Sequence, residues 1–348
     1  MVRSIAAFLV ALVVAYATTP LMRRVALRFQ VVDRPNQRKV HRVPVPYLGG
    51  VAIYLGFLAA LLVIQPFSHR LLVLVFGSTL VLLLGVADDL WDLPAKAKFA
   101  GQVGIALLVA LLGLRIQGLT NPFDGYLDLG WWSIPLTVLW LVSLTNVMNL
   151  VDGLDGLAAG VASIAAAALW VVAVGKGQHL VALATLALSG AAAGFLPHNF
   201  NPAKIFMGDA GSMFLGFTLA GIAVQGALKG AATIALVIPV VALGLPVFDT
   251  ACAISRRFQN GQPIYEADRA HIHHRLLALG LTPKQAVLVL YLLSAILGLA
   301  AVVISRLSPG PTAVLVVAVV AALLLLAERL GVIRPLGTKG RRHTRTAF

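Results

Sequence analysis

Five aspartates lie where apolar segments of the chain should end and meet water at a membrane surface. They are Asp88, Asp89, Asp152, Asp155 and Asp209, in a chain with only 13 acidic residues. Hard divalent cations, and the phosphates that they carry, require carboxylates gathered on one side of a bilayer. The pattern therefore predicts metal-dependent chemistry at a membrane interface.

The most informative group is the segment TNVMNLVDGLDGLAAG, which contains Asn149, Asp152 and Asp155. These residues are three apart, so neighbours share a helical face if the helix continues, although two glycines interrupt it. Buried amides and carboxylates are costly at membrane depth unless they have a partner. The segment therefore indicates a binding site, with a structural polar turn as the alternative.

Asp88 and Asp89 are adjacent at the end of an apolar run. Two such carboxylates repel each other unless a cation or a shared proton compensates, which predicts a metal ligand beside a base of raised pKa. The alternative is a solvated helix end balanced by Lys96 and Lys98. At the start of the next helix, Lys98 would contact a phosphate or a lipid headgroup.

Asp209 belongs to a GDAGS segment directly before an apolar helix. The free N–H groups of a helix start favour anions, so Asp209 beside them could hold a phosphate-bound cation. The alternative is that Asp209 or Ser212 only caps the helix.

Two basic segments complete the set. Residues 31–50 include Lys39 and His41 and end in a Gly–Gly pair, which suits phosphate binding but also a cytoplasmic positive loop. In the later segment, His271, His274 and Arg275 would share one helical face, with His273 turned away. There are no thiolate ligands and no HExxH spacing, so we expect contacts to a diphosphate or sugar rather than zinc; the alternative is a polar helix without a ligand.

The composition identifies the elements that must position these residues. The chain is 59% hydrophobic and 11% charged, with a mean hydropathy of +0.93, as is typical of membrane proteins. Eleven runs are long enough to cross a bilayer as helices, which predicts an all-α polytopic protein: 4–22, 48–65, 70–87, 99–115, 131–148, 157–174, 178–196, 211–228, 232–250, 285–305 and 311–330. We expect one catalytic membrane domain over residues 1–333 and a basic cytoplasmic tail over 334–348.

The distribution of basic residues predicts the orientation. With the N-terminus outside and the C-terminus cytoplasmic, 21 of the 27 Lys and Arg residues fall on the cytoplasmic side. Residues 116–130 would then form a small extracytoplasmic hairpin. The net charge of +14 indicates anionic lipid and anionic substrate as partners, not nucleic acid.

Taken together, the motifs resemble the polyprenyl-phosphate N-acetylhexosamine-1-phosphate transferases, the superfamily that includes phospho-N-acetylmuramoyl-pentapeptide transferase. The resemblance spans roughly residues 1–330, and its five signatures occur in order at 33–50, 85–89, 146–158, 206–212 and 271–275. The muramoyl-pentapeptide branch typically has three consecutive histidines, a run that Ile272 interrupts here. The sequence is therefore more similar to the GlcNAc-1-phosphate branch.

This resemblance implies transfer of GlcNAc-1-phosphate from UDP-GlcNAc to undecaprenyl phosphate, with release of UMP, in the bacterial inner membrane. Such a reaction begins a cell-envelope polysaccharide such as lipopolysaccharide or teichoic acid. It also implies Mg²⁺, with Mn²⁺ as a substitute, held by Asp209, Asn149 and Asp89. The implied catalytic residues are Asp88, Asp89, Asp152, Asp155 and His274. The implied substrate-binding residues are Lys39, His41, Lys98, Asn149, His271, His273 and Arg275.

Direct attack by the lipid phosphate is favoured over an aspartyl intermediate, because a phosphate monoester is already an adequate nucleophile. A sibling transferase using UDP-MurNAc-pentapeptide or another UDP-HexNAc, and a cation-coupled transporter, are the competing functions. A transporter would place polar residues at mid-bilayer and on both faces. A homodimer is compatible with the lipid-facing surfaces.

Overall fold

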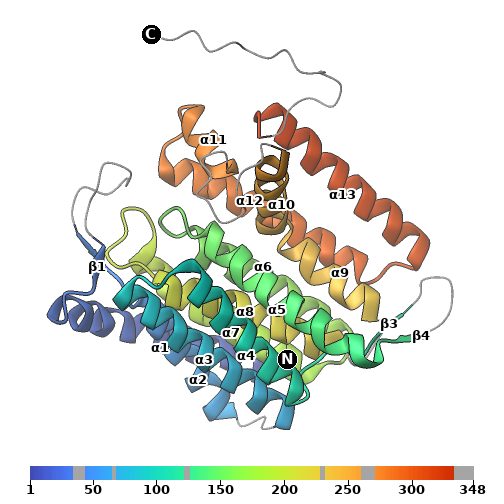
Figure 1. The fold of residues 1–348 in the computed structure, drawn as a ribbon, viewed down its shortest axis with the longest axis horizontal. Coiled ribbons are helices and arrows are strands. Elements are labelled where there is room, and N and C mark those ends of the chain that lie inside the picture. Colours follow the sequence, from blue (N-terminus) through green and yellow to red (C-terminus); the bar gives the residue numbers. More distant parts are fainter. Residues whose placement is uncertain (34–43, 65–67, 121–125, 228–231, 260–270, 333–348) are drawn as a thin grey trace.

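The computed structural model describes residues 1–33, 44–64, 68–120, 126–227, 232–259 and 271–332 (Figure 1). Their regular secondary structure is helical apart from two short hairpins and one 3₁₀ turn, which confirms the all-α prediction. The helices are α1 (Val2–Arg28), α2 (Gly49–Ile64), α3 (His69–Trp91), α4 (Ala95–Leu111), α5 (Ser133–Val151), α6 (Leu157–Gly175), α7 (His179–Asn199), α8 (Gly208–Ala227), α9 (Ala232–Ala242), α10 (Gly244–Gln259), α11 (Ile272–Ala278), α12 (Pro283–Ile304) and α13 (Pro309–Arg329).

Each of the eleven apolar runs forms helix, but the described residues contain fewer complete membrane spans than predicted. Seven helices are long and apolar enough to cross a bilayer, or eight if the bent pair α9–α10 counts as one span. Helix α2 has 16 residues, about 24 Å of helix against a hydrocarbon core of about 30 Å. Helices α4 and α8 open with polar turns, which contain Lys98 and Asp209 respectively.

The predicted helix over 232–250 is wrong as a single element, because the chain bends by 84° between α9 and α10. Pro246 lies in the first turn of α10 and has no N–H to donate to a preceding carbonyl, which favours a break in the helix before it. After the bend, α10 packs against α5, α9 and α12. The bend therefore returns the polar residues of α10 to the rest of the protein.

Helix α8 is the centre of the bundle and contacts α2, α3 and α5 closely. Glycines allow these approaches. A Cβ at Gly85 of α3 would collide with the backbone of Ala210, and one at Gly50 of α2 would collide with the backbone of Gly211. In the membrane, where water does not drive helix association, such close contact is a main source of helix–helix stability. These contacts fix the first turn of α8 against α2 and α3.

Two antiparallel hairpins lie on opposite sides of the bundle (Figure 1). Strand β1 (Val32–Asp33) pairs with β2 (Val45–Pro46), and β3 (Gly118–Thr120) pairs with β4 (Tyr126–Asp128). A 3₁₀ turn, η1 (Gly130–Trp132), connects β4 to α5. The second pair confirms the hairpin predicted within 116–130. The tail 334–348 lies outside the described residues.

Replacing Gly85 with alanine should destabilise the protein, because the new methyl group meets the α8 backbone, which cannot rotate away. Overpacking of this kind costs roughly 1–3 kcal/mol of unfolding free energy. Gly104→Ala in α4 is the matched control, since nothing lies within 4 Å of a Cβ there. Thermal unfolding in detergent should show a lower midpoint for Gly85→Ala only, and equal midpoints would contradict this packing.

Candidate active site

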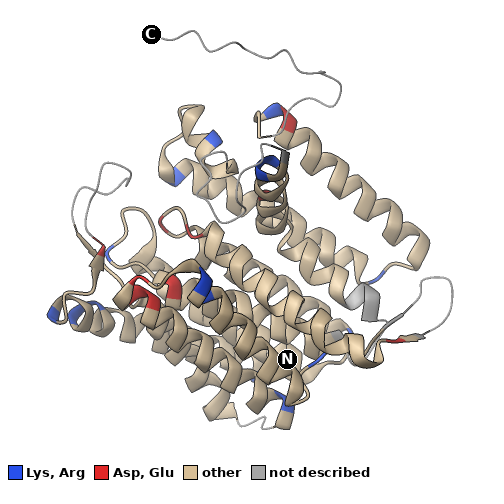
Figure 2. Ribbon diagram, in the orientation of Figure 1, with Lys and Arg blue, Asp and Glu red and all other residues tan. Residues whose placement is uncertain are grey.

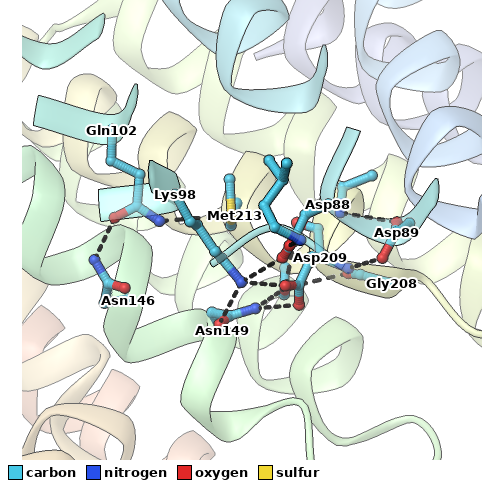
Figure 3. Close-up of polar contacts among 12 residues, drawn as sticks. Asp88, Asp89, Lys98, Gln102, Asn146, Asn149, Gly208, Asp209 and Met213 are labelled. Atoms are coloured by element: carbon cyan, nitrogen blue, oxygen red, sulfur yellow. Dashed lines mark hydrogen bonds and ion pairs between the residues drawn. The ribbon is translucent and has the colours of Figure 1, made fainter. Parts of the chain in front are cut away.

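The site is organised around the N-terminus of α8, which a carboxylate from another helix caps (Figure 3). The Asp89 side chain, near the end of α3, accepts hydrogen bonds from the backbone N–H groups of Asp209 (2.7 Å) and Ala210 (3.2 Å). The first N–H groups of a helix have no partner within the helix and carry partial positive charge. Both Asp89 oxygens therefore fix the start of α8, and with it the Asp209 side chain.

Lys98, in the first turn of α4, joins three oxygen-bearing side chains (Figure 3). Its Nζ lies 2.8 Å from Oδ2 of Asp88, 3.4 Å from Oδ1 of Asn149, and in a short ion pair with Oδ2 of Asp209. Asn149 in turn donates its amide to Asp209 Oδ1 at 2.6 Å. The ends of four helices thus bring carboxylate and amide oxygens around one cationic group.

A second polar layer supports Lys98 and Asn149 from within the bundle (Figure 3). Gln102, one turn along α4 from Lys98, accepts a 2.5 Å hydrogen bond from Asn146, one turn before Asn149 in α5. The Gln102 amide also faces the sulfur of Met213 in α8 at 3.5 Å. Because buried amides are costly when unpaired, this contact holds α4 and α5 in one relative position.

Between α5 and α6 the chain makes the predicted glycine-containing turn. Helix α5 ends at Val151, and Gly156 has a positive φ of 83° directly before α6. Asp155 accepts hydrogen bonds from the Asn201 side chain (2.9 Å) and the Ala203 backbone (3.0 Å). Its carboxylate therefore holds the loop between α7 and α8, a role that the sequence did not indicate.

Helix α11 places the histidine motif beside this turn, but not with the predicted face. His271 precedes the helix with an extended backbone, so it does not share a helical face with His274 and Arg275. His273 is buried, whereas His274 is exposed. The His273 ring packs on Gly153, where an added Cβ would lie 2.8 Å from Nε2. The prediction that His273 turns away is therefore wrong, because the helix begins one residue later than assumed.

Two glycines that follow the basic segment are hydrogen-bonded to the residues directly before α8. Gly49 and Gly50 donate backbone hydrogen bonds of 2.9 Å to the carbonyls of Phe206 and Met207. Tyr47 hydrogen-bonds Asp33 across the β1–β2 hairpin, and burial, followed by this carboxylate, raises the pKa of Tyr47 well above its ordinary value. Lys39 and His41 lie outside the described residues.

Asp152 is the least compensated carboxylate of the group. Among the described residues its side chain accepts no hydrogen bond, and burial, followed by the charges of Asp209, Asp89 and Asp155, raises the pKa of Asp152 to about 8. A raised pKa favours the neutral form of this carboxyl group near neutral pH, and a nearby cation would favour its anion. Asp152 therefore gains most from a cation that binds beside Asp209.

The donor set fits a hard cation that also binds phosphate. Within the described residues, no three acidic, histidine or cysteine side chains form a complete metal cluster. Mg²⁺ is commonly bound by one or two carboxylates together with substrate phosphates rather than by an all-protein cage. Asp209, Asn149 and Asp152 supply such oxygens, whereas the oxygens of Asp89 are engaged by the backbone of α8.

Sequence reasoning missed Gln102, Asn199, Asn201 and Asp249. Asn199 bridges the N–H of Gly156 and the carbonyl of Ile205, both at 3.0 Å, and so joins the two loops of the site. Asp249 did carry a usable signal, since an ionisable residue within an apolar run is itself a functional-site hypothesis. The other three are amides, whose partners depend on contacts between distant segments.

The fold and the site define a multi-pass helical membrane protein with an acidic, cation-compensated centre where several helices end. Its sequence matches the model of a family described as glycosyl transferase family 4 over residues 71–227. The chain belongs to this family, and the resemblance predicted from its motifs is confirmed.

Individual relatives cover nearly the whole chain. A Bacillus subtilis (strain 168) protein named as a probable undecaprenyl-phosphate N-acetylglucosaminyl 1-phosphate transferase is 39% identical over 306 residues, covering 87% of this chain and 86% of its own. A Mycolicibacterium smegmatis decaprenyl-phosphate N-acetylglucosaminephosphotransferase is 38% identical, with coverages of 92% and 88%. A Yersinia pestis undecaprenyl-phosphate alpha-N-acetylglucosaminyl 1-phosphate transferase is 32% identical, with coverages of 87% and 85%.

Removing the Asp89 carboxylate should destabilise the protein without removing its cation site. Asp89→Ala leaves the N–H groups of Asp209 and Ala210 unsatisfied, at a cost of roughly 1–3 kcal/mol of unfolding free energy for each. Asp89→Asn retains one acceptor and should be intermediate. Thermal unfolding with and without Mg²⁺ measures both effects, with Asp128→Ala on β4 as the control. If Asp89→Asn stays folded but loses all stabilisation by Mg²⁺, Asp89 is a ligand after all.

His273 should make stability depend on pH below neutrality. Burial, followed by the neighbouring His274, lowers the pKa of His273 from 6.5 to about 4. Between these values the unfolded chain binds more protons than the folded chain, so stability should fall as the pH decreases from about 6.5 to 4. Thermal midpoints across this range should decline less steeply in His273→Gln than in the wild type or in His69→Gln. Parallel curves for all three proteins would contradict the assignment.

Proposed function

We propose that this protein transfers GlcNAc-1-phosphate from UDP-GlcNAc to undecaprenyl phosphate, and so begins a cell-envelope polysaccharide. The observation that carries the proposal is the convergence of Asp88, Asn149 and Asp209 on the Lys98 ammonium, beside the uncompensated Asp152. This arrangement suits a substrate that brings both phosphate groups and a divalent cation. The relatives named for the same reaction, with different polyprenyl carriers, support the donor and the acceptor class.

The transfer is a direct displacement. An oxygen of the lipid phosphate attacks the β-phosphorus of UDP-GlcNAc, the bond from this phosphorus to the α–β bridging oxygen breaks, and UMP leaves. Mg²⁺, with Mn²⁺ as a substitute, neutralises phosphate charge when bound. We assign its ligands to Asp209, Asn149 and Asp152, and we assign Asp89 to positioning the start of α8.

Lys98 and Asp88 are placed to receive the phosphates. The ammonium of Lys98 is half-buried between two carboxylates, so a phosphate oxygen can replace one carboxylate as its partner without leaving the charge unpaired. Asp88 would then orient the attacking lipid phosphate. His273 packs on Gly153 in the Asp152–Gly156 turn, and its ring contacts those of His271 and His274. We propose that these histidines, with Arg275, Lys39 and His41, contact the sugar or the diphosphate.

The same proposal fixes the orientation in a bacterial inner membrane. Most Asp and Glu residues lie at the end of the bundle with β1 and α11 (Figure 2), and the segments that hold most of the basic residues are predicted to be cytoplasmic. We therefore place this end in the cytoplasm, where the nucleotide sugar is made, with the N-terminus and the β3–β4 hairpin outside. Residues 1–333 form the catalytic domain in this scheme.

The decisive experiment measures UMP release and transfer of radiolabel into lipid by the purified protein. With undecaprenyl phosphate and UDP-GlcNAc we expect labelled lipid in the presence of Mg²⁺ and none after its chelation. Asp209→Asn should reduce turnover by at least roughly 100-fold, as expected when a charged group that organises phosphoryl transfer is lost. Asp128→Asn, on the opposite hairpin, should keep wild-type turnover.

Donor and acceptor series distinguish the alternatives. Product from UDP-MurNAc-pentapeptide or another UDP-HexNAc, but not from UDP-GlcNAc, would support the proposed reaction type and identify a different sugar donor. A faster reaction with decaprenyl phosphate than with undecaprenyl phosphate would identify decaprenyl phosphate as the preferred acceptor. If no donor gives UMP and the protein conducts cations in proteoliposomes, the transferase function is contradicted and a transporter function is supported.

A further inference from the structure

Asp249 forms a buried hydrogen-bonded pair with His271, between α10 and the start of α11. Its Oδ2 lies 2.9 Å from Nδ1 of His271, and its Oδ1 accepts a 3.0 Å hydrogen bond from the backbone N–H of Ile272. Both side chains are nearly inaccessible, His271 at 7% and Asp249 at 8% exposure. Buried charges persist only with such partners, and here both oxygens of the carboxylate are used for one neighbouring segment.

This contact determines the protonation pattern of the His271 ring. A carboxylate only accepts hydrogen bonds, so Nδ1 must carry the proton that lies between it and Asp249. The other nitrogen, Nε2, is then left to act as an acceptor when the ring is neutral. A buried aspartate that fixes the tautomer and orientation of a histidine in this way is a recurrent device of active sites.

The contact also fixes where α11 lies. Ile272 begins the helix, and the His271 ring stacks on the ring of His273 with an interplanar angle of 6° and a centroid distance of 5.7 Å. His273 in turn packs on Gly153, between Asp152 and Asp155. A displacement of the first turn of α11 would therefore change the contact between the histidine motif and the acidic turn.

We propose that Asp249 is a positioning residue for the donor-binding part of the site. It holds His271 in the Nδ1–H form, so that Nε2 accepts a hydrogen bond from the sugar nucleotide, and it anchors α11 on α10. This inference rests on the proposed function for the identity of the donor. The bend between α9 and α10 is what brings Asp249 to this place, since a straight helix through 232–250 would direct it away.

Nitrogen-15 NMR of histidine-labelled protein in nanodiscs tests the protonation pattern without any activity. The His271 signals are assigned by their absence in His271→Gln. We expect a protonated Nδ1 in the wild type and a shift toward the Nε2–H form in Asp249→Asn, because the new amide can donate to Nδ1. The amide oxygen of this variant can still accept from the N–H of Ile272, so the fold should persist. A wild-type His271 that carries its proton on Nε2 alone would overturn the proposal, whether or not the variant folds.

Kinetics then test the positioning role. Asp249→Asn should raise the KM for UDP-GlcNAc by roughly 10–100-fold, the usual range for losing a residue that orients a ligand group, with a smaller change in kcat. Asp128→Asn should leave both constants unchanged. Adding Asp249→Asn to His271→Gln should cause no further loss, because the two residues act through one contact. Additive losses would contradict this role, whereas an inactive wild type with the expected NMR pattern would reject the proposed function alone.

Discussion

The contact between the Asp89 carboxylate and the first N–H groups of α8 is the constraint on which the rest of the site depends. A helix that starts inside a membrane protein has no water for its free N–H groups, so another part of the protein must supply the acceptor. Here α3 supplies it, 120 residues before Asp209 in the chain. Glycines at the same level let α2 and α3 approach α8 closely enough for the contact to form.

Once the start of α8 is fixed in this way, the need to pair charges explains the positions of the remaining polar residues of the site. Asp209 extends from the capped turn toward two other carboxylates, Asp88 and Asp89, whose charges repel its own unless a cationic group compensates them. Lys98 and Asn149 provide that compensation from α4 and α5. Their own positions are held by the Gln102–Asn146 hydrogen bond one turn deeper in the bundle. The network therefore connects α3, α4, α5 and α8 through side chains alone.

The sequence predicted those features that depend on local pattern. Hydropathy located every helix except α11, turn chemistry located the glycine break after Asp152, and charge located the acidic residues that meet around Asp209. It could not predict which carboxylates are engaged by the backbone, since the partners of Asp89 and Asp155 are distant in the chain. The prediction that His271 shares one face of α11 with His274 and Arg275 was also wrong, because hydrogen bonding to Asp249 decides where that helix begins. The bend at α10 carried a local signal in Pro246, but apolar composition alone favoured a continuous span.

The pairing of the carboxylates also indicates where substrate charge belongs. Asp89 is satisfied by the start of α8, Asp155 by the loop before α8, Asp249 by α11, and Asp88 and Asp209 share Lys98. Each of these contacts holds protein segments together, so none of them needs a ligand for its own stability. Asp152 has no comparable partner among the described residues, and after burial the charge of Asp209 contributes to its raised pKa. A cation that arrives with a diphosphate would therefore be most strongly stabilised between Asp152 and Asp209. Its positive charge would offset the repulsion between these two carboxyl groups, for which the protein alone provides no cation beside Asp152.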